Sequence, residues 1–331
     1  MRALIAALGF VLLAAGFEQA RAEPVTIRGA WVAIANWPAI WMAKKDLAVH
    51  DGKSYTFAPV HFVGTPPMIT AIANNQVEIG DLAYSTLPIA IENAGLDDIR
   101  VIGSDFEDGF DGYHTTQFEV LKNGPIHRVE DLKGKVVATN AEGAAVDITM
   151  KAMLHRHGLE PNRDYTEVEA PFPAMQSMLA EKKASLIPAV PPFVFDPGLM
   201  KIARTLFTAK QAIGVSQFIV LTARKPFIDA HRAALVDFME DTLRIARWYM
   251  DPKNHAAVEQ IMAKLTKQPA SHFDWVFTKK DFYRNPDLLP DLDALQRNVD
   301  TTQQLGFVKA HLDVKSHSDL SIVKEAAERL K

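Results

Sequence analysis

The side chains of this 331-residue chain are poorly arranged for catalysis. The chain has no cysteine, which excludes thiolate nucleophiles and cysteine-bound zinc or iron–sulfur centres. It contains neither the Gly-x-Ser-x-Gly turn that exposes a catalytic serine nor the His-Glu-x-x-His zinc motif. Its eleven histidines are scattered, and His155 and His157 would point to different sides of a helix. We therefore expect no enzymatic activity, no cofactor and no metal site.

Another set of residues is suited to holding a small molecule. In open α/β sheets, ligands bind beyond the carboxyl ends of the strands, where loops lead into helices. Applied to the strands predicted below, this rule predicts ligand contacts for Asn36, Trp37, Trp41, Gly64, Thr65, Ser85, Thr86, His114, Gly143, Ala144, Ala145, Phe172, Phe193 and Asp196. Phe193 and its neighbour Phe195 should divide between pocket and core, because alternate residues of an extended segment face opposite ways.

Several of these residues have an equally ordinary structural interpretation. Trp37 and Trp41 could stack on a flat ligand, but their four-residue spacing also fits a core-facing stripe of a helix. Ser85 and Thr86 could form a helix cap instead of touching a ligand. A lone histidine such as His114 is more often structural than a charge switch. The sequence leaves these alternatives open.

The predicted ligand loops and their flanks carry acidic but no basic side chains, namely Asp81, Glu142, Asp147 and Asp196. The helix that opens near Gly143 would present free N–H groups, which favour anions. Nitrate or a sulfonate could be held by such N–H groups and by hydroxyls alone. The absence of Lys and Arg nevertheless favours an organic solute that is flat or weakly charged.

The elements that position these loops include a repeated pattern. Residues 68–84 and 175–191, offset by 107 positions, each change from helical to strand spacing of apolar residues. In the first copy, Met68, Ala71 and Ile72 are spaced for a helix, and Val77 and Ile79 for a strand. Copies this far apart indicate two similar α/β lobes. The alternative is that any helix–turn–strand unit of an α/β protein would look alike.

Further apolar segments predict the rest of the two lobes. We expect strands at 25–29, 55–63, 79–82, 100–104, 136–139, 165–168 and 219–221, helices after Thr65 and at 145–157, a loop at 105–112, and helical structure over 226–331. The chain would then cross between the lobes twice, near 112–117 and near 214–218. Two crossings make a hinge, and a hinge allows closure around a ligand.

The first 22 residues predict export. Arg2, an apolar stretch from Ala3 to Ala15 and the sequence Ala20-Arg21-Ala22 match the positive start, short apolar core and cleavage site of a signal peptide. The stretch is shorter than the roughly 20 residues that span a bilayer. We therefore expect a periplasmic mature chain that begins at Glu23 and forms two domains. The formal net charge of −4 of the full chain and the lack of a basic stripe argue against nucleic acid as a partner.

The order of the segments resembles the periplasmic substrate-binding proteins of nitrate/sulfonate/taurine-type ABC importers, whose domain is similar to the NMT1/THI5-like domain. The resemblance covers the mature chain and rests on an aromatic-rich loop after the first strand, Gly64-Thr65 leading to Met68 to Asp81, Val129 to Lys135 before a strand, and Phe172-Pro173-Ala174-Met175 leading to Ile187 to Phe193. The family usually has Gly in the turn of each repeat, where this chain has Asn75 and Lys182. Because Lys tolerates a left-handed turn less readily than Asn, the second turn is expected to be altered.

The resemblance implies a type II periplasmic-binding-protein fold, with two α/β lobes joined by two crossover segments. Lobe 1 would comprise residues 23–113 and 219–331, and lobe 2 residues 114–218. A monomer would capture a small organic solute in the interlobe cleft by hinge closure and deliver it to an ABC permease with a cytoplasmic ATPase. The solute could be a sulfonate, taurine or nitrate-type anion, or an aromatic or heteroaromatic compound. A periplasmic sensing module of the same fold is the alternative, whereas the related synthase branch resembles a protein with clustered cysteines, which this chain lacks.

Overall fold

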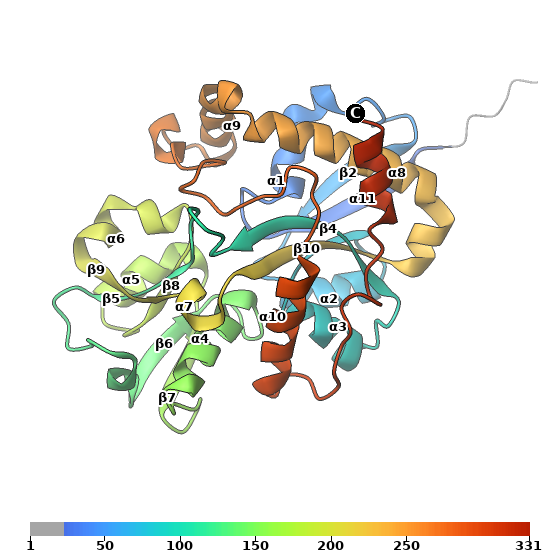
Figure 1. The fold of residues 1–331 in the computed structure, drawn as a ribbon. Helices are drawn as coiled ribbons and strands as arrows, with labels where there is room; N and C mark the ends of the chain where they lie inside the picture. Colours follow the sequence, from blue (N-terminus) through green and yellow to red (C-terminus); the bar gives the residue numbers. More distant parts are fainter. Residues whose placement is uncertain (1–22) are drawn as a thin grey trace, which may run out of the picture.

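The computed structural model describes residues 23–331, and the predicted signal peptide at residues 1–22 lies outside the described part. Two groups of strands and helices lie side by side, and we call them lobe 1 and lobe 2 (Figure 1). None of the described helices is both long and apolar enough to cross a membrane. The fold is therefore that of a two-lobed α/β protein, as the sequence predicts.

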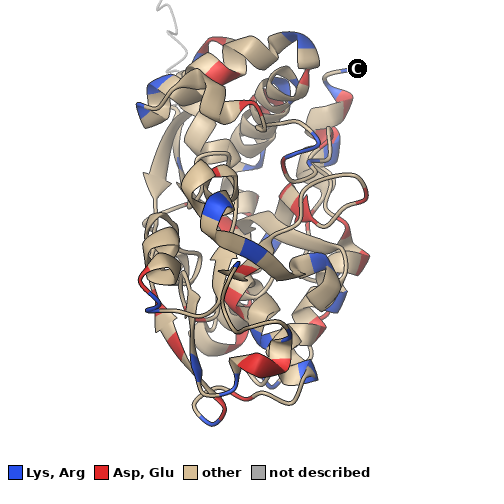
Figure 2. Cartoon of the chain, turned by 90° about the vertical axis from the view of Figure 1, so that its left-hand side faces the viewer, with Lys and Arg blue, Asp and Glu red and all other residues tan. Residues whose placement is uncertain are grey.

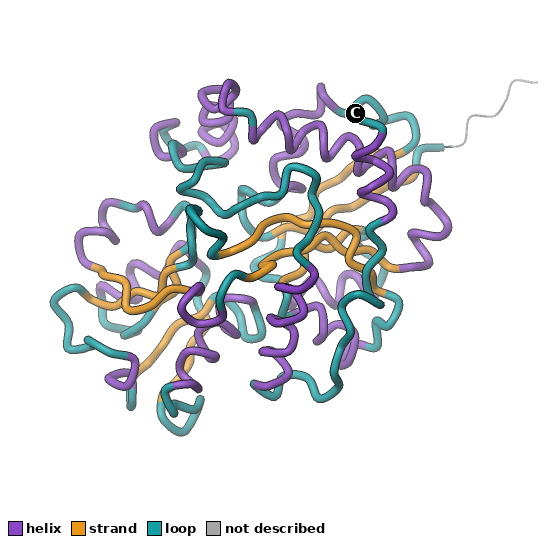
Figure 3. Tube along the Cα trace, in the orientation of Figure 1, coloured by secondary structure: helices purple, strands orange, loops and turns teal. Residues whose placement is uncertain are grey.

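Lobe 1 is built on a five-stranded sheet with the strand order β2-β1-β3-β10-β4, which runs through the centre of Figure 3. Its strands are β1 (Val25–Trp31), β2 (Tyr55–His61), β3 (Ile79–Ala83), β4 (Ile99–Asp108) and β10 (Ser216–Arg224). β1 pairs in parallel with β2 and β3, whereas β10 runs antiparallel to β3 and β4. β3 and β10 are buried on both faces, which accounts for their almost continuous apolar sequences.

Helices cover both faces of this sheet (Figure 1). One hydrophobic core lies between the sheet and α1 (Trp37–Trp41), α8 (Lys225–Met250), α9 (His255–Thr266) and α11 (Ser321–Glu328). The other core lies under α2 (Pro66–Ala73), α3 (Thr86–Ala94) and α10 (Leu292–Gln304). Short 3-10 helices occupy Met42–Leu47, Pro252–Asn254 and Ala270–Phe273. The expected helical region after residue 226 thus completes lobe 1, with extended loops between its helices.

Lobe 2 contains two small sheets. The order of the first is β8-β5-β9, and the second pairs β6 with β7 in parallel. The strands are β5 (Gln117–Leu121), β6 (Lys135–Thr139), β7 (Tyr165–Glu169), β8 (Ile187–Ala189) and β9 (Ala203–Thr208). The helices are α4 (Ala145–Arg156), α5 (Met175–Ala180), α6 (Pro197–Ile202) and α7 (Ala209–Ile213), with 3-10 turns at Val129–Leu132, Phe172–Ala174 and Phe193–Phe195. A bridge between Val137 and Leu186 brings the two sheets together.

The two copies of the repeat fold alike, one in each lobe. Asn75 and Lys182 both adopt the left-handed conformation, with φ of 52° and 58°. In the first copy the N–H of the next residue, Gln76, donates to the carbonyl of Ala71 at 2.8 Å, and in the second Lys183 donates to Met178 at 2.9 Å. The expectation of an altered second turn was wrong, because Lys182 accepts the left-handed conformation that the turn requires.

Replacing Lys182 with glycine should stabilise the protein. An exposed non-glycine residue in the left-handed region carries a steric cost of about 1 kcal/mol that glycine avoids. We expect Lys182→Gly to raise the free energy of unfolding by up to about 1 kcal/mol, measured by urea denaturation. Lys182→Ala is the matched control, since it removes the same side chain but keeps the Cβ atom, and an equal gain in both variants would contradict the explanation.

One expected loop is instead a strand. Residues 105–108 were predicted to begin a loop, but they extend β4 and pair with β10 through an irregular register. The acidic side chains of this segment are buried, although acidic residues are usually exposed and their sequence therefore gives little indication of a buried strand. β4 then leads into β5 of the second group of strands, and the chain returns from α7 into β10.

Candidate functional site

A cavity of about 80 Å³ lies between the lobes, next to the ends of β1, β3, β6 and β8. Both lobes contribute to its wall, which is formed by Val32, Ala33, Asn36, Thr65, Asp81, Ala83, Phe106, Asn140, Ala144, Ala145, Val146, Phe172, Val190, Pro191, Phe218, Ile219 and Phe282. A water needs roughly 10–15 Å³ of such space, so the cavity admits a small solute of several atoms. Most of the wall is apolar, with aromatic rings from both lobes.

Of the predicted ligand residues, the cavity wall includes Asn36, Thr65, Ala144, Ala145 and Phe172. They come from loops that follow strands in both lobes, which is where the rule for open α/β sheets places ligand contacts. The hydroxyl of Thr65 is buried and has no hydrogen-bond partner among residues 23–331.

Three other predicted residues lie where the lobes touch. The Oγ of Ser85 donates to the carbonyl of Gly143 at 2.7 Å, which joins the end of β3 to the start of α4. A Cβ atom on Gly64 would lie 3.2 Å from the Cβ of Ala141, so this glycine allows close approach of lobe 2. Next to Ser85, the Oη of Tyr84 donates to the carbonyl of Ala145 at 3.1 Å. These residues connect the lobes beside the cavity.

Trp37 and Trp41 do not line the cavity. They are 2% and 1% exposed and belong to the core between α1 and α8. Trp37 stacks on Phe277 with ring centroids 5.5 Å apart, and Trp41 packs against Phe57 at 4.7 Å. Their spacing is that of a core-facing helical stripe, so the ligand-stacking interpretation gives way to the structural one.

The remaining predicted residues serve other local structures. The hydroxyl of Thr86 donates to the carbonyl of Ala83 at 3.0 Å within the same turn. Asp196 caps α6 by accepting the N–H of Gly198 at 2.7 Å. Together with Phe193 it lines a separate, open groove rather than the cavity. His114 packs edge-on against Phe282 at 5.2 Å, at the first crossing.

The start of α4 offers fewer free N–H groups than its sequence predicts. The N–H of Gly143 donates to the carboxylate of Asp147 at 2.7 Å, and the N–H of Glu142 donates to Glu169. Two of the backbone donors expected for an anion are therefore already occupied by carboxylates of the chain itself. The expectation of free N–H groups at the start of this helix was wrong for Glu142 and Gly143.

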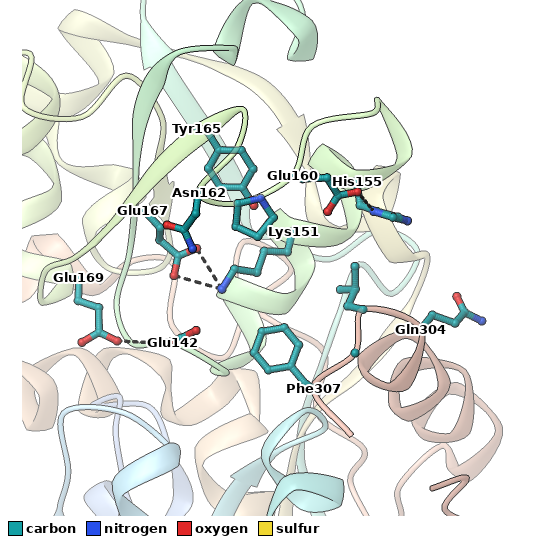
Figure 4. A pocket seen from close by; sticks show the side chains of 13 residues that line it. Glu142, Lys151, His155, Glu160, Asn162, Tyr165, Glu167, Glu169, Gln304 and Phe307 are labelled. Atoms are coloured by element: carbon teal, nitrogen blue, oxygen red, sulfur yellow. Dashed lines mark hydrogen bonds and ion pairs between the residues drawn. The ribbon is translucent and has the colours of Figure 1, made fainter. Parts of the chain in front are cut away.

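A larger cavity of about 470 Å³ lies between α4, β7 and the residues after α10 (Figure 4). Several of its charged side chains form pairs: Lys151 lies 2.9 Å from Asp147 and 3.1 Å from Glu167, and His155 lies 2.7 Å from Glu160. The carboxylate of Glu169 accepts the backbone N–H of Glu142. The ammonium of Lys151 also lies 5.0 Å from the ring centre of Phe307 in lobe 1. This cavity is therefore polar and acidic, and the contact between Lys151 and Phe307 joins the two lobes beside it.

The wall of the smaller cavity, of about 80 Å³, contains a buried acidic group that is not among the predicted ligand residues. Asp81 forms part of the wall and is 1% exposed, and the fully buried Asp105 lies against it. The side-chain amide of Asn36 donates to Asp105. The guanidinium of Arg284 bonds instead to the carboxylate of Asp281 at 2.9 Å and the carbonyl of Ala35 at 3.1 Å. The sequence signal that could have identified Asp81 is its position as a carboxyl within the otherwise apolar segment of β3.

Burial dominates the electrostatics of these carboxyls. It raises the pKa of Asp81 well above its usual range, and the adjacent carboxyl of Asp105 raises it further. Burial also raises the pKa of Asp105 to about 6, although Arg284 and the bond from Asn36 act in the opposite direction. Two carboxyls in contact cannot both ionise cheaply, so the pair holds a proton that they share.

These features define a class: a two-lobed α/β protein of the type II periplasmic-binding-protein fold, with a cavity between the lobes. The sequence model of the NMT1/THI5-like family matches residues 63–255, and the chain belongs to this family. No curated protein sequence matches the chain.

Solved structures share the fold at low sequence identity. The alkanesulfonate-binding protein SsuA from Xanthomonas axonopodis pv. citri, bound to MOPS, superposes with a TM-score of 0.70 at 15% identity, over 90% of this chain and 99% of that one. The periplasmic nitrate-binding protein NrtA from Synechocystis PCC 6803 has a TM-score of 0.70 at 13% identity, over 93% and 90%. The desulfurization enzyme DszB has a TM-score of 0.66 at 11% identity, over 93% and 100%.

His114 should make stability depend on pH. Burial lowers its pKa to about 4, compared with about 6.5 in the unfolded chain. Between these values the unfolded chain binds more protons, so the stabilisation is present above pH 6.5 and is lost as pH falls towards 4. From pH 7 to pH 5, we expect the wild type to lose about 2 kcal/mol more than His114→Phe, measured by urea unfolding. The exposed His311→Gln should behave as the wild type, and equal losses in all three proteins would contradict the prediction.

Proposed function

We propose that the protein is the solute-binding component of an ABC importer and captures a small organic solute between its lobes. The observation that carries this proposal is the cavity whose wall comes from both lobes. The names of the solved proteins of the same fold, which include alkanesulfonate- and nitrate-binding proteins, support a receptor role. A solute that touches both walls stabilises the closed arrangement in proportion to its differential affinity for that state.

The moving parts follow from the topology. We assign residues 23–113 and 219–331 to lobe 1 and residues 114–218 to lobe 2, with the two crossings as the hinge. The hydrogen bonds from Tyr84 and Ser85 to lobe 2 then belong to the closed arrangement. We further propose that the mature protein is a periplasmic monomer, released from its signal peptide, and that it docks on a permease with a cytoplasmic ATPase.

Two other functions are less well supported. The desulfurization enzyme DszB shares the fold, and a cysteine variant of it was solved with biphenyl-2-sulfinic acid. This chain has no cysteine, and Asp81 is the sole ionisable side chain among the described residues of the cavity wall. One buried carboxyl without a nucleophile or metal ligands gives little basis for catalysis. A periplasmic sensing module would use the same cavity and differ only in its membrane partner.

Filling the cavity should abolish solute binding. The test is a thermal-shift screen of residues 23–331 against nitrate, alkanesulfonates, taurine, aromatic acids, pyrimidines and flavins, in which a ligand at 100 times its Kd adds about 2.7 kcal/mol. We expect Ala145→Leu to weaken any hit by more than about tenfold, because Ala145 forms part of the wall. Ala152→Leu, on the same helix but outside the wall, is the matched control.

Small-angle scattering should show a smaller radius of gyration when the hit is bound. A hit that Ala145→Leu binds as tightly as the wild type would place the site elsewhere. If the protein is folded and none of the compounds in the screen raises its melting temperature, the result would argue against a receptor for these solutes.

A further inference from the structure

We infer that the solute carries a cationic N–H group, an amidinium or a protonated amine on a small apolar body, which faces Asp81 and Asp105. This inference rests on the proposed function, since it names the class of solute that the interlobe cavity takes. It is carried by the hydrogen bonding, charge and shape of the wall.

Asp81 presents to the cavity a buried oxygen that lacks a donor. Its side chain lies in the wall and is almost fully buried, and no N–H or hydroxyl of the described residues donates to either of its oxygens. Asp105 accepts from Asn36, and the proton that the two carboxyls share satisfies one oxygen of Asp81, which leaves the other oxygen of Asp81 without a donor. A buried acceptor without a donor is costly, so a donor on the solute would satisfy an oxygen that the protein leaves unsatisfied.

Among the described residues, the one guanidinium near the pair, that of Arg284, does not form a hydrogen bond with Asp81 or Asp105. The three buried carboxyls of Asp81, Asp105 and Asp281 surround one guanidinium, that of Arg284. This guanidinium bonds directly to Asp281, 2.9 Å away, and makes no hydrogen bond to the other two carboxyls. The proton shared by Asp81 and Asp105 therefore neutralises part of their negative charge. A cationic solute group would do the same and would displace this proton.

The same wall disfavours an anion. Its described residues include no Lys or Arg, and an anion would lie beside a buried carboxyl with no screening by water. The N–H groups of Glu142 and Gly143 already donate to carboxylates. The start of α4 still forms the opposite wall, where it can meet acceptor atoms or the face of the solute.

The shape sets the size of the solute. The cavity of about 80 Å³ fits a compact group, and the rings of Phe106, Phe172 and Phe282 offer an apolar surface to the rest of the molecule. Amidinium and carboxylate are planar groups of the same shape and opposite charge, so they form matched probes. Acetamidine and acetate test the smallest size, and benzamidine and benzoate test a flat aromatic body.

The experiment measures the affinity of residues 23–331 for these four compounds and for methanesulfonate and nitrate, by isothermal titration calorimetry at pH 7.5. We expect the amidines to bind and the anions not to bind. Asp81→Asn keeps the shape of the side chain but removes its charge, and it should weaken amidine binding by at least about tenfold. Glu119→Gln is the matched control, because Glu119 is a buried carboxyl of β5 outside the cavity.

Each other result overturns the inference. Amidine binding that survives in Asp81→Asn would remove the carboxyl from recognition, and an equal loss in Glu119→Gln would point to a general effect of buried carboxyls. Anion binding without amidine binding would reverse the solute class and leave the receptor function intact. If neither series binds, this solute class is wrong, and the broader screen with Ala145→Leu decides separately whether the cavity receives a solute.

Discussion

The antiparallel pairing of β4 with β10 is the constraint on which the rest of the molecule depends. Both strands lie in the sheet of lobe 1, and both lead directly into the crossings to lobe 2. The buried carboxylate of Asp108 fixes the first crossing by accepting the N–H of Thr116 at 3.1 Å with each oxygen. Phe106 and Phe218 on these strands also line the cavity, so the strands that connect to the crossings form part of the cavity wall.

The sequence predicted the architecture because local periodicity and chain order carry it. The repeat at residues 68–84 and 175–191 was visible in spacing alone, and its two turns use the same hydrogen bonds. Strand ends then located loops of the cavity, including those of Asn36, Thr65 and Ala144. The turn at Lys182 was predicted wrongly because the intrinsic preference of a residue type does not decide its backbone conformation alone. Lys182 adopts a left-handed conformation because the turn must lead into the strand that follows.

The site itself was less predictable, because side-chain direction and burial depend on tertiary packing. Trp37 and Trp41 fit a pocket and a core equally well in sequence, and only the position of α8 over α1 assigns them to the core. Asp105 was expected in a loop, because its segment is acidic and contains glycine, and acidic residues are rarely buried in strands. Its proximity to Asp81 arises from a sheet in which β10 lies between their strands, a relation that no local pattern records.

The hydrogen bonds from Tyr84 and Ser85 to lobe 2 are neutral and individually weak. A hydrogen bond such as that from Ser85 to Gly143 contributes about 0.5–1.5 kcal/mol net, which is comparable to a tenfold difference in affinity. Under the proposed receptor function, the affinity of a solute that contacts both walls is therefore enough to shift the population of the closed arrangement. A charged contact gains most in that arrangement, because water is excluded and the effective dielectric is low. The burial that makes the carboxyls of Asp81 and Asp105 unfavourable without a partner is thus also what makes them selective for one.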